Sequence, residues 1–133
     1  MTIKVLIIDD DRDNADLLGL LLQRYGIAVS VRYSGKSALE TLRDFDPDLA
    51  IIDICMKEMD GYETSKKIRQ HTRKKHIILI ALTGYGGGLQ DRDHFKSAGF
   101  DHHFIKPISF KEISRIFIEM VPIYNNLEDN SLP

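Results

Sequence analysis

The chain has 133 residues, of which 43% are hydrophobic and 29% charged, so we expect a folded domain rather than a disordered segment. Its formal net charge is −2, and basic residues are scattered among acidic ones, which argues against a nucleic-acid partner. No apolar run approaches the roughly 18 residues that span a bilayer, and the run after Met1 soon ends in aspartates, so neither a membrane segment nor a signal peptide is expected. The single cysteine, Cys55, cannot form an internal disulfide, and we expect a cytoplasmic protein.

Short apolar runs alternate with amphipathic stretches along the chain. In chain order they predict a strand at 3–8, a helix at 14–25, a strand at 27–31, a helix at 34–45, a strand at 49–54, a helix at 62–71, a strand at 77–82, a helix at 89–98, a strand at 102–105 and a helix at 109–120. Three strands, with the sequences "VLII", "LAIIDI" and "IILIAL", are almost continuously apolar, which is typical of strands covered on both faces. The second strand, "IAVSV", alternates and is expected nearer an edge.

This alternation of strands and helices predicts right-handed β-α-β crossovers and a sheet with helices on both faces. The predicted fold class is therefore α/β, with a single doubly wound five-stranded parallel sheet and five helices. We expect one domain, residues 1–121, followed by a short polar tail at 122–133 that is frayed.

Polar side chains follow four of the predicted strands. They are Asp9, Asp10 and Asp11 after the first strand, Asp53 at the end of the third, Thr83 after the fourth and Lys106 after the fifth. In an open parallel sheet these strand ends share one edge, where ligands bind. Clustered carboxylates repel one another unless a cation lies among them, and Mg²⁺, or Mn²⁺ in its place, prefers such oxygen ligands. A lysine and a hydroxyl beside them suit a phosphoryl group, so the sequence predicts a site at which a carboxylate can become an aspartyl phosphate.

Four segments of the sequence together resemble a known family. They are "VLIIDDD", "LAIIDICMKEMDG", "IALTG" and "FIKP", which follow one another in the order and approximate spacing of the receiver domain of bacterial two-component response regulators. The resemblance extends from residue 3 to residue 121. It implies a flavodoxin-like strand order of 2-1-3-4-5.

The resemblance also implies a role for each acidic residue. Asp53 matches the phosphoacceptor, and Asp9 and Asp10 match an acidic pair in which Asp10 binds Mg²⁺ directly and Asp9 mainly through water. The backbone carbonyl of Cys55 falls where the family supplies a third protein ligand. Asp11 follows the pair, and we expect it to face solvent or to cap the first helix.

Three further residues match the family's phosphoryl-binding and switching positions. Thr83 matches the hydroxyl that rotates toward the phosphoryl oxygen, and Lys106 matches the lysine that pairs with it. His103 occupies the switch position that usually holds an aromatic ring. An alternative interpretation leaves His103 as a half-exposed histidine with no switching role.

The sequence departs from the family pattern in two places. Lys57 stands where the family usually has proline, which favours a less rigid loop after Asp53, although neutral variation explains the change equally well. As a hypothesis, Lys57 alters the lifetime of the phosphorylated state. The triple glycine Gly86–Gly88 precedes the fourth helix, and we expect this segment to be mobile.

The function implied by the resemblance is that of a phospho-accepting receiver rather than a conventional enzyme. A histidine kinase or histidine phosphotransfer protein would supply the phosphoryl group, and slow self-catalysed hydrolysis would remove it. The surface of the fourth helix, fifth strand and fifth helix would then signal to a downstream protein. The sequence does not identify the kinase, the target or any phosphorylation-dependent homodimer, and it leaves open whether the receiver stands alone or belongs to a hybrid kinase.

Two other functions fit part of the pattern. The spacing of Asp9 and Asp11 resembles the D-x-D of haloacid-dehalogenase-like phosphatases, but it lacks their usual continuation and leaves Asp53 unexplained. A pure interaction module with this fold would never take up phosphate. Against that alternative stands the presence of a complete set of site residues, namely Asp10, Asp53, Thr83 and Lys106.

Overall fold

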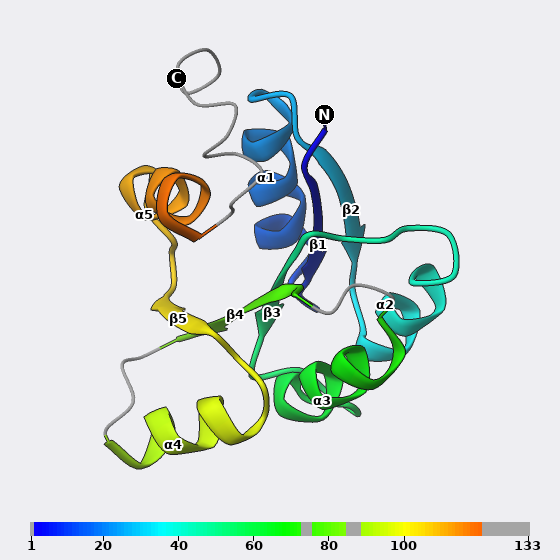
Figure 1. Ribbon diagram of the computed structural model, residues 1–133, viewed down its shortest axis with the longest axis vertical. Coiled ribbons are helices and arrows are strands. Elements are labelled where there is room, and N and C mark those ends of the chain that lie inside the picture. The colour runs from blue at the N-terminus through cyan, green and yellow to red at the C-terminus, as the bar shows by residue number, and fades with distance from the viewer. Residues whose placement is uncertain (1, 73–75, 85–88, 121–133) are drawn as a thin grey trace.

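Strands and helices alternate along the whole described part of the chain (Figure 1). The computed structural model describes residues 2–72, 76–84 and 89–120. Its elements are β1 (Lys4–Ile8), α1 (Arg12–Gln23), β2 (Ala28–Arg32), α2 (Gly35–Thr41), β3 (Leu49–Asp53), α3 (Gly61–His71), β4 (Ile78–Thr83), α4 (Leu89–Ser97), β5 (His102–Ile105), α5 (Phe110–Arg115) and a π-helical turn, η1 (Ile116–Met120). The tail 122–133 and the triple glycine Gly86–Gly88, predicted to be frayed and mobile, lie outside the described residues.

The five strands form one sheet in the order β2-β1-β3-β4-β5, and every pair of neighbours is parallel. This confirms the predicted strand order and the predicted place of β2 at an edge. In the centre of the sheet Ile8 lies beside Ile52, and Ile52 lies beside Ala81. The carboxyl ends of β1, β3 and β4 are therefore level, which places the residues that follow them at one edge.

Two apolar cores lie on opposite faces of the sheet. In β1, Val5 and Ile7 face the core under α1 and α5, whereas Leu6 and Ile8 face the core under α2, α3 and α4 (Figure 1). Because both faces are covered, all four of these side chains are buried. Full burial of each is worth about 1.5–3 kcal/mol, which explains why the central strands are continuously apolar.

Helix bounds differ from the predicted ones where a cap or a tight turn intervenes. Helix α1 begins two residues early because Asp11 caps it, its side chain accepting the N–H of Asn14. Helix α2 ends at Thr41 because the amides that follow, including that of Asp44, bond three residues back and tighten the chain. After α5 the chain widens into η1, and the consecutive residues Ile116 and Phe117 are both buried.

The side chain of Arg69, near the end of α3, ties three segments together. Its guanidinium donates to the carbonyl of Ile77 at 2.6 Å and to that of Gly99 at 2.7 and 3.1 Å, and it pairs with Asp101 at 2.8 Å. Asp101 in turn accepts the N–H of Leu79. This network joins the start of β4 to the start of β5.

None of the described helices is long and apolar enough to cross a membrane.

Candidate phosphoryl and metal site

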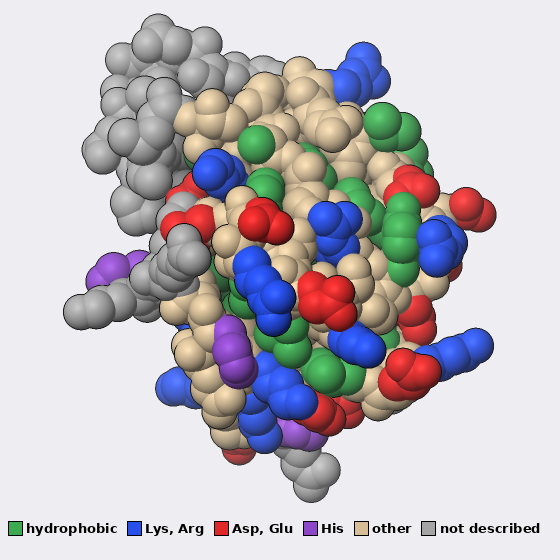
Figure 2. All heavy atoms as spheres, turned by 90° about the vertical axis from the view of Figure 1, so that its right-hand side faces the viewer, with side chains coloured by type: hydrophobic (Ala, Val, Ile, Leu, Met, Phe, Trp, Pro, Cys, Tyr) green, Lys and Arg blue, Asp and Glu red, His purple; other side chains and the backbone are tan. Residues whose placement is uncertain are grey.

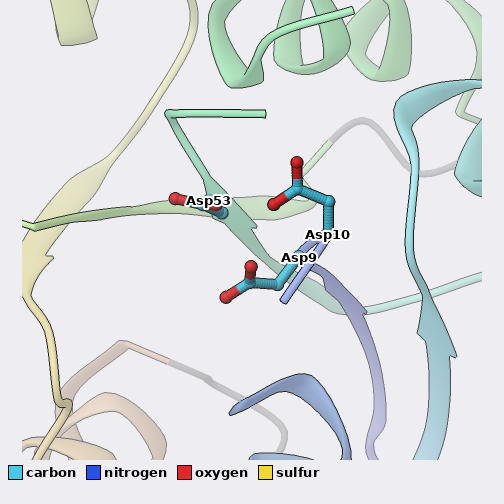
Figure 3. Close-up of side chains that lie close together, drawn as sticks. All are labelled: Asp9, Asp10 and Asp53. Carbon is cyan, nitrogen blue, oxygen red and sulfur yellow. The ribbon is translucent and has the colours of Figure 1, made fainter. Parts of the chain in front are cut away.

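Three carboxylates meet at the carboxyl edge of the sheet (Figure 3). Asp9 and Asp10 follow β1, and Asp53 ends the neighbouring strand β3. One oxygen from each residue lies within 4.8 Å of the others. Asp9 and Asp53 are only 3% and 4% exposed, whereas Asp10 is exposed. The three carboxylates therefore lie close together, as the sequence predicted.

Lys106, which follows β5 at the same edge of the sheet, reaches this cluster with its side chain. Its Nζ lies 3.0 Å from Asp9 Oδ2 and 3.2 Å from Asp53 Oδ1. The main-chain N–H of Lys106 donates to the carbonyl of Thr83 at 2.8 Å, which fixes where the lysine leaves β5. Three carboxylates and one ammonium leave a net negative charge that a divalent cation would offset. The set of carboxylate oxygens, partly open to solvent at Asp10, fits a hard cation such as Mg²⁺.

The environment of Asp53 disfavours its charged form. Burial and the charge of Asp9 raise the pKa of Asp53 to about 6, although Lys106 acts in the opposite direction. For Lys106, burial lowers the pKa, but its bonds to Asp9 and Asp53 outweigh burial, so the net pKa is raised. The lysine is therefore charged near neutral pH, and the Asp53 carboxylate is held against an electrostatic cost.

This raised pKa predicts how stability depends on pH without a divalent cation. The ordinary pKa of an aspartate is 3.8, and in the folded protein the pKa of Asp53 is raised to about 6. The folded state therefore has its full stability below pH 4 and loses part of it as the pH rises through 6. The expected loss is about 1–3 kcal/mol. Urea unfolding of wild type and Asp53→Asn in EDTA, across this pH range, measures it as a difference. A difference that does not change with pH would contradict the prediction.

Each carboxylate of the cluster also accepts one main-chain N–H. The donors are Asp11 to Asp9 Oδ1 at 2.9 Å, Lys57 to Asp10 Oδ2 at 3.1 Å and Cys55 to Asp53 Oδ1 at 3.2 Å. Hydrogen bonds to a carboxylate stabilise its charged form and fix its orientation. These donors could not be found from the sequence, because every residue except proline carries an N–H and residue type gives no signal of its use.

Asp11 does not contribute its carboxylate to the cluster. Its Oδ1 accepts the main-chain N–H of Asn14 at 3.2 Å, and its Oδ2 accepts the side-chain amide of Asn14 at 2.9 Å. The predicted helix cap is thus confirmed. A dehalogenase-like site would need Asp9 and Asp11 to act together, and this geometry gives Asp11 another role.

The loop between β3 and α3 is packed tightly beneath the site. The N–H of Gly61 donates to the carbonyl of Ile54 at 3.0 Å, and a Cβ added at Gly61 would lie 2.5 Å from the carbonyl oxygen of Asp53. Glu58, in the middle of this loop, has a φ of 62°. Cys55 is exposed in the loop, and the ligand role of its carbonyl stays a prediction. The sequence signal for Gly61 is the "DG" that precedes the predicted helix at 62–71.

Thr83 and His103 lie where the sequence placed them, on neighbouring strands. Thr83 ends β4, is 7% exposed and lies beside Ile105 in the sheet. His103 is half-buried, and its ring stacks on that of Phe95 in α4 with 4.8 Å between centroids. The ring thus lies where β5 meets α4. Its switching role remains a prediction.

On the face that carries α2, acidic and basic side chains are interleaved (Figure 2). Exposed Lys36, Glu40, Arg43 and Asp44 follow one another in and after this helix. Neighbouring charges of opposite sign cancel at a distance, so this face does not present a field of one sign.

The sequence matches the family model of the response regulator receiver domain over residues 5–117. Together with the parallel sheet and the acidic edge, this match shows that the chain belongs to the response regulator receiver domain family. It is 31% identical over 124 residues to the polar-differentiation response regulator DivK of Brucella ovis, covering 93% of this chain and 97% of that protein. Several other curated relatives are longer, and the chain spans only 7% to 24% of their length.

Solved structures agree with the fold. A CheY-like receiver domain protein from Methanospirillum hungatei is 23% identical and superposes with a TM-score of 0.82, covering 96% of this chain and 99% of that one. The receiver domain of the sensor histidine kinase PA1611 from Pseudomonas aeruginosa is 23% identical with a TM-score of 0.78, covering 91% and 98% of the two chains. That structure is described as having a magnesium ion coordinated in its active-site cleft.

Proposed function

We propose that this chain is a phosphorylation-dependent signalling receiver that takes up a phosphoryl group on Asp53. The donor is a phosphohistidine on a histidine kinase or a histidine phosphotransfer protein, and residues 1–121 form the domain that carries the activity. The observation that carries the proposal is the buried Asp53 carboxylate with Lys106 Nζ at 3.2 Å and two further carboxylates beside it. Within the family, this arrangement favours aspartate phosphorylation over a passive interaction role.

The transfer is a simple exchange of bonds at phosphorus. A carboxylate oxygen of Asp53 attacks, the O–P bond forms as the N–P bond of phosphohistidine breaks, and the electron pair leaves with the imidazole. With a pKa of about 6, Asp53 is mostly ionised at neutral pH and can act as the nucleophile. Lys106 supplies positive charge next to the acceptor oxygen, where it can pair with an incoming phosphoryl oxygen.

The residues that would hold Mg²⁺ are Asp10, Asp53 and the carbonyl of Cys55, with Asp9 acting mainly through water. Mn²⁺ could take its place, since it accepts the same oxygen ligands. When bound, the metal neutralises charge on the phosphoryl oxygens. Asp9 and Asp53 both pair with Lys106 Nζ, at 3.0 and 3.2 Å, so the lysine and the cation would share these two carboxylates.

Signalling would proceed through Thr83 and His103 to the surface of α4, β5 and α5. The stack of His103 on Phe95 supports this, because movement of the ring must change its contact with α4. Three large apolar side chains near this surface are exposed to solvent: Ile105 at 48%, Phe110 at 51% and Ile118 at 46%. Exposed apolar residues of this size favour a protein target, of which a second copy of the chain is one candidate.

Labelling with a small phosphodonor tests the proposal. Purified protein incubated with acetyl phosphate and Mg²⁺ is expected to gain the mass of one phosphoryl group, and EDTA should prevent the gain. Asp10→Ala should reduce labelling and weaken Mg²⁺ binding by more than about tenfold. Transfer from a panel of phosphorylated kinases would then identify the donor. If neither EDTA nor Asp10→Ala reduced the extent of labelling, the metal-dependent mechanism would be refuted.

A further inference from the structure

The main chain at Lys57 contacts a carboxylate that lies far away in the sequence. Its N–H donates to Asp10 Oδ2 at 3.1 Å across a separation of 47 residues. The bond joins the β3–α3 loop to the segment that follows β1. It depends on the main-chain N–H of residue 57 and not on the lysine side chain, which is exposed.

The loop is shaped so that alternate amides face the cluster. The N–H of Cys55 donates to Asp53 Oδ1, and that of Lys57 donates to Asp10 Oδ2. Between them, Met56 is 9% exposed, packs into the core under α2, α3 and α4, and donates its N–H to the carbonyl of Ile54 at 3.2 Å. The anchored methionine thus fixes the direction of the amides on either side of it.

Asp10 has a particular need for such a restraint. Asp9 and Asp53 are buried and pair with Lys106, whereas Asp10 is exposed and, within the described part of the chain, lies outside the ion pairs of Lys106. An exposed side chain that must hold one orientation loses rotamer freedom when it binds a cation. A hydrogen bond already formed to one carboxylate oxygen reduces that loss.

We propose that the main-chain N–H of Lys57 is a positioning group that holds Asp10 ready for the divalent cation. The Lys57 N–H donates to Oδ2, and among the described residues Oδ1 of Asp10 has no hydrogen bond, so Oδ1 would be available to the cation. Proline at this position would have no N–H to donate, so the bond depends on the residue being a non-proline. The inference rests on the metal site of the proposed function but concerns binding before any phosphorylation.

Mg²⁺ titration of the unphosphorylated full chain by calorimetry tests the proposal with three variants. Lys57→Ala keeps the N–H and removes the ammonium, Lys57→Pro removes the N–H, and an ester-linked α-hydroxy analogue of alanine at 57 replaces the N–H with oxygen. The ester variant is needed because proline also restricts the backbone of Met56. Loss of one hydrogen bond to a carboxylate is expected to weaken Mg²⁺ binding about three- to tenfold in the proline and ester variants, with alanine like the wild type.

A second measurement follows the hydrogen bond itself. Amide hydrogen exchange at Lys57 is expected to be slowed in the wild type and to become faster in Asp10→Ala. The proposal is overturned if the ester variant binds Mg²⁺ as tightly as the wild type, or if alanine weakens binding as much as proline does. If Asp53 takes no label while these affinities still differ, the positioning role stands and the proposed phosphorylation fails. If the wild type binds no Mg²⁺, both fail.

Discussion

Asp53→Asn is expected to take up no phosphoryl group under conditions that label the wild type, and to be more stable than the wild type in Mg²⁺-free buffer at neutral pH. Labelling is lost because an amide is not a nucleophile toward phosphorus at this site. Asparagine has nearly the same shape as aspartate, and its oxygen can still accept the N–H of Cys55, which now donates to Asp53 Oδ1 at 3.2 Å. The variant therefore separates the charge of residue 53 from its packing.

The stability gain follows from the electrostatics of the buried cluster. Burial and Asp9 raise the pKa of Asp53 to about 6, so ionisation at neutral pH costs the folded state free energy that the amide avoids. The gain is expected to be about 1–3 kcal/mol, and this figure already includes the favourable effect of Lys106 on the charged form of Asp53. Lys106 keeps its contact with Asp9 at 3.0 Å, so its ammonium is not left without a partner. Urea unfolding in EDTA measures the change.

Asp60→Asn is the matched control. Asp60 is exposed, caps α3 and accepts the N–H of Glu63 at 2.9 Å, and asparagine is as good a cap as aspartate. We expect this variant to be labelled normally and to unfold like the wild type. Labelling of Asp53→Asn to the wild-type level would mean that another residue accepts the phosphoryl group, and destabilisation in EDTA would mean that the cluster is not strained.

The sequence was sufficient to predict the fold and to predict which carboxylates form the acidic cluster. The same physical reason explains both. A parallel sheet covered on both faces needs central strands that are apolar throughout, and residues that follow those strands must share an edge. Asp9 and Asp53 therefore could be placed together from "VLIIDDD" and "LAIIDICMKEMDG" alone. The predicted helix bounds were less accurate, because local interactions set them. These are the cap at Asp11, where α1 begins, and the tight turns after Thr41, where α2 ends.

What the sequence did not predict depends on interactions that residue type does not encode. The amides of Cys55 and Lys57 bind carboxylates only because of how one loop is folded. Arg69 joins the carbonyl of Gly99 to Asp101, and nothing in the local pattern of α3 distinguishes this arginine from an exposed one. Lys106 was expected to meet a phosphoryl group, and its pairing with two of the carboxylates was not foreseen.

Gly61→Ala is expected to destabilise the protein by about 1–3 kcal/mol and to weaken Mg²⁺ binding, because it forces a methyl group into the main chain under the site. The added Cβ would lie 2.5 Å from the carbonyl oxygen of Asp53 and 2.7 Å from the Cα of Ile54. Both are backbone atoms that cannot rotate away. The loop must therefore move, and with it the Cys55 and Lys57 amides that hold Asp53 and Asp10.

Two other glycines make this prediction a graded test. At Gly35 an added Cβ would meet the side chain of Thr64 and, at 2.8 Å, that of Met59, whereas at Gly84 no atom of the described residues lies within 4 Å. Thr64 is buried and its hydroxyl donates to the carbonyl of Asp60, so Gly35→Ala should also destabilise the protein, and Gly84→Ala should cost least of the three. Urea unfolding of the three variants measures this order. If Gly61→Ala proved as stable as Gly84→Ala and bound Mg²⁺ equally well, the loop would tolerate displacement, and tight packing beneath Asp53 would not be what holds the site in shape.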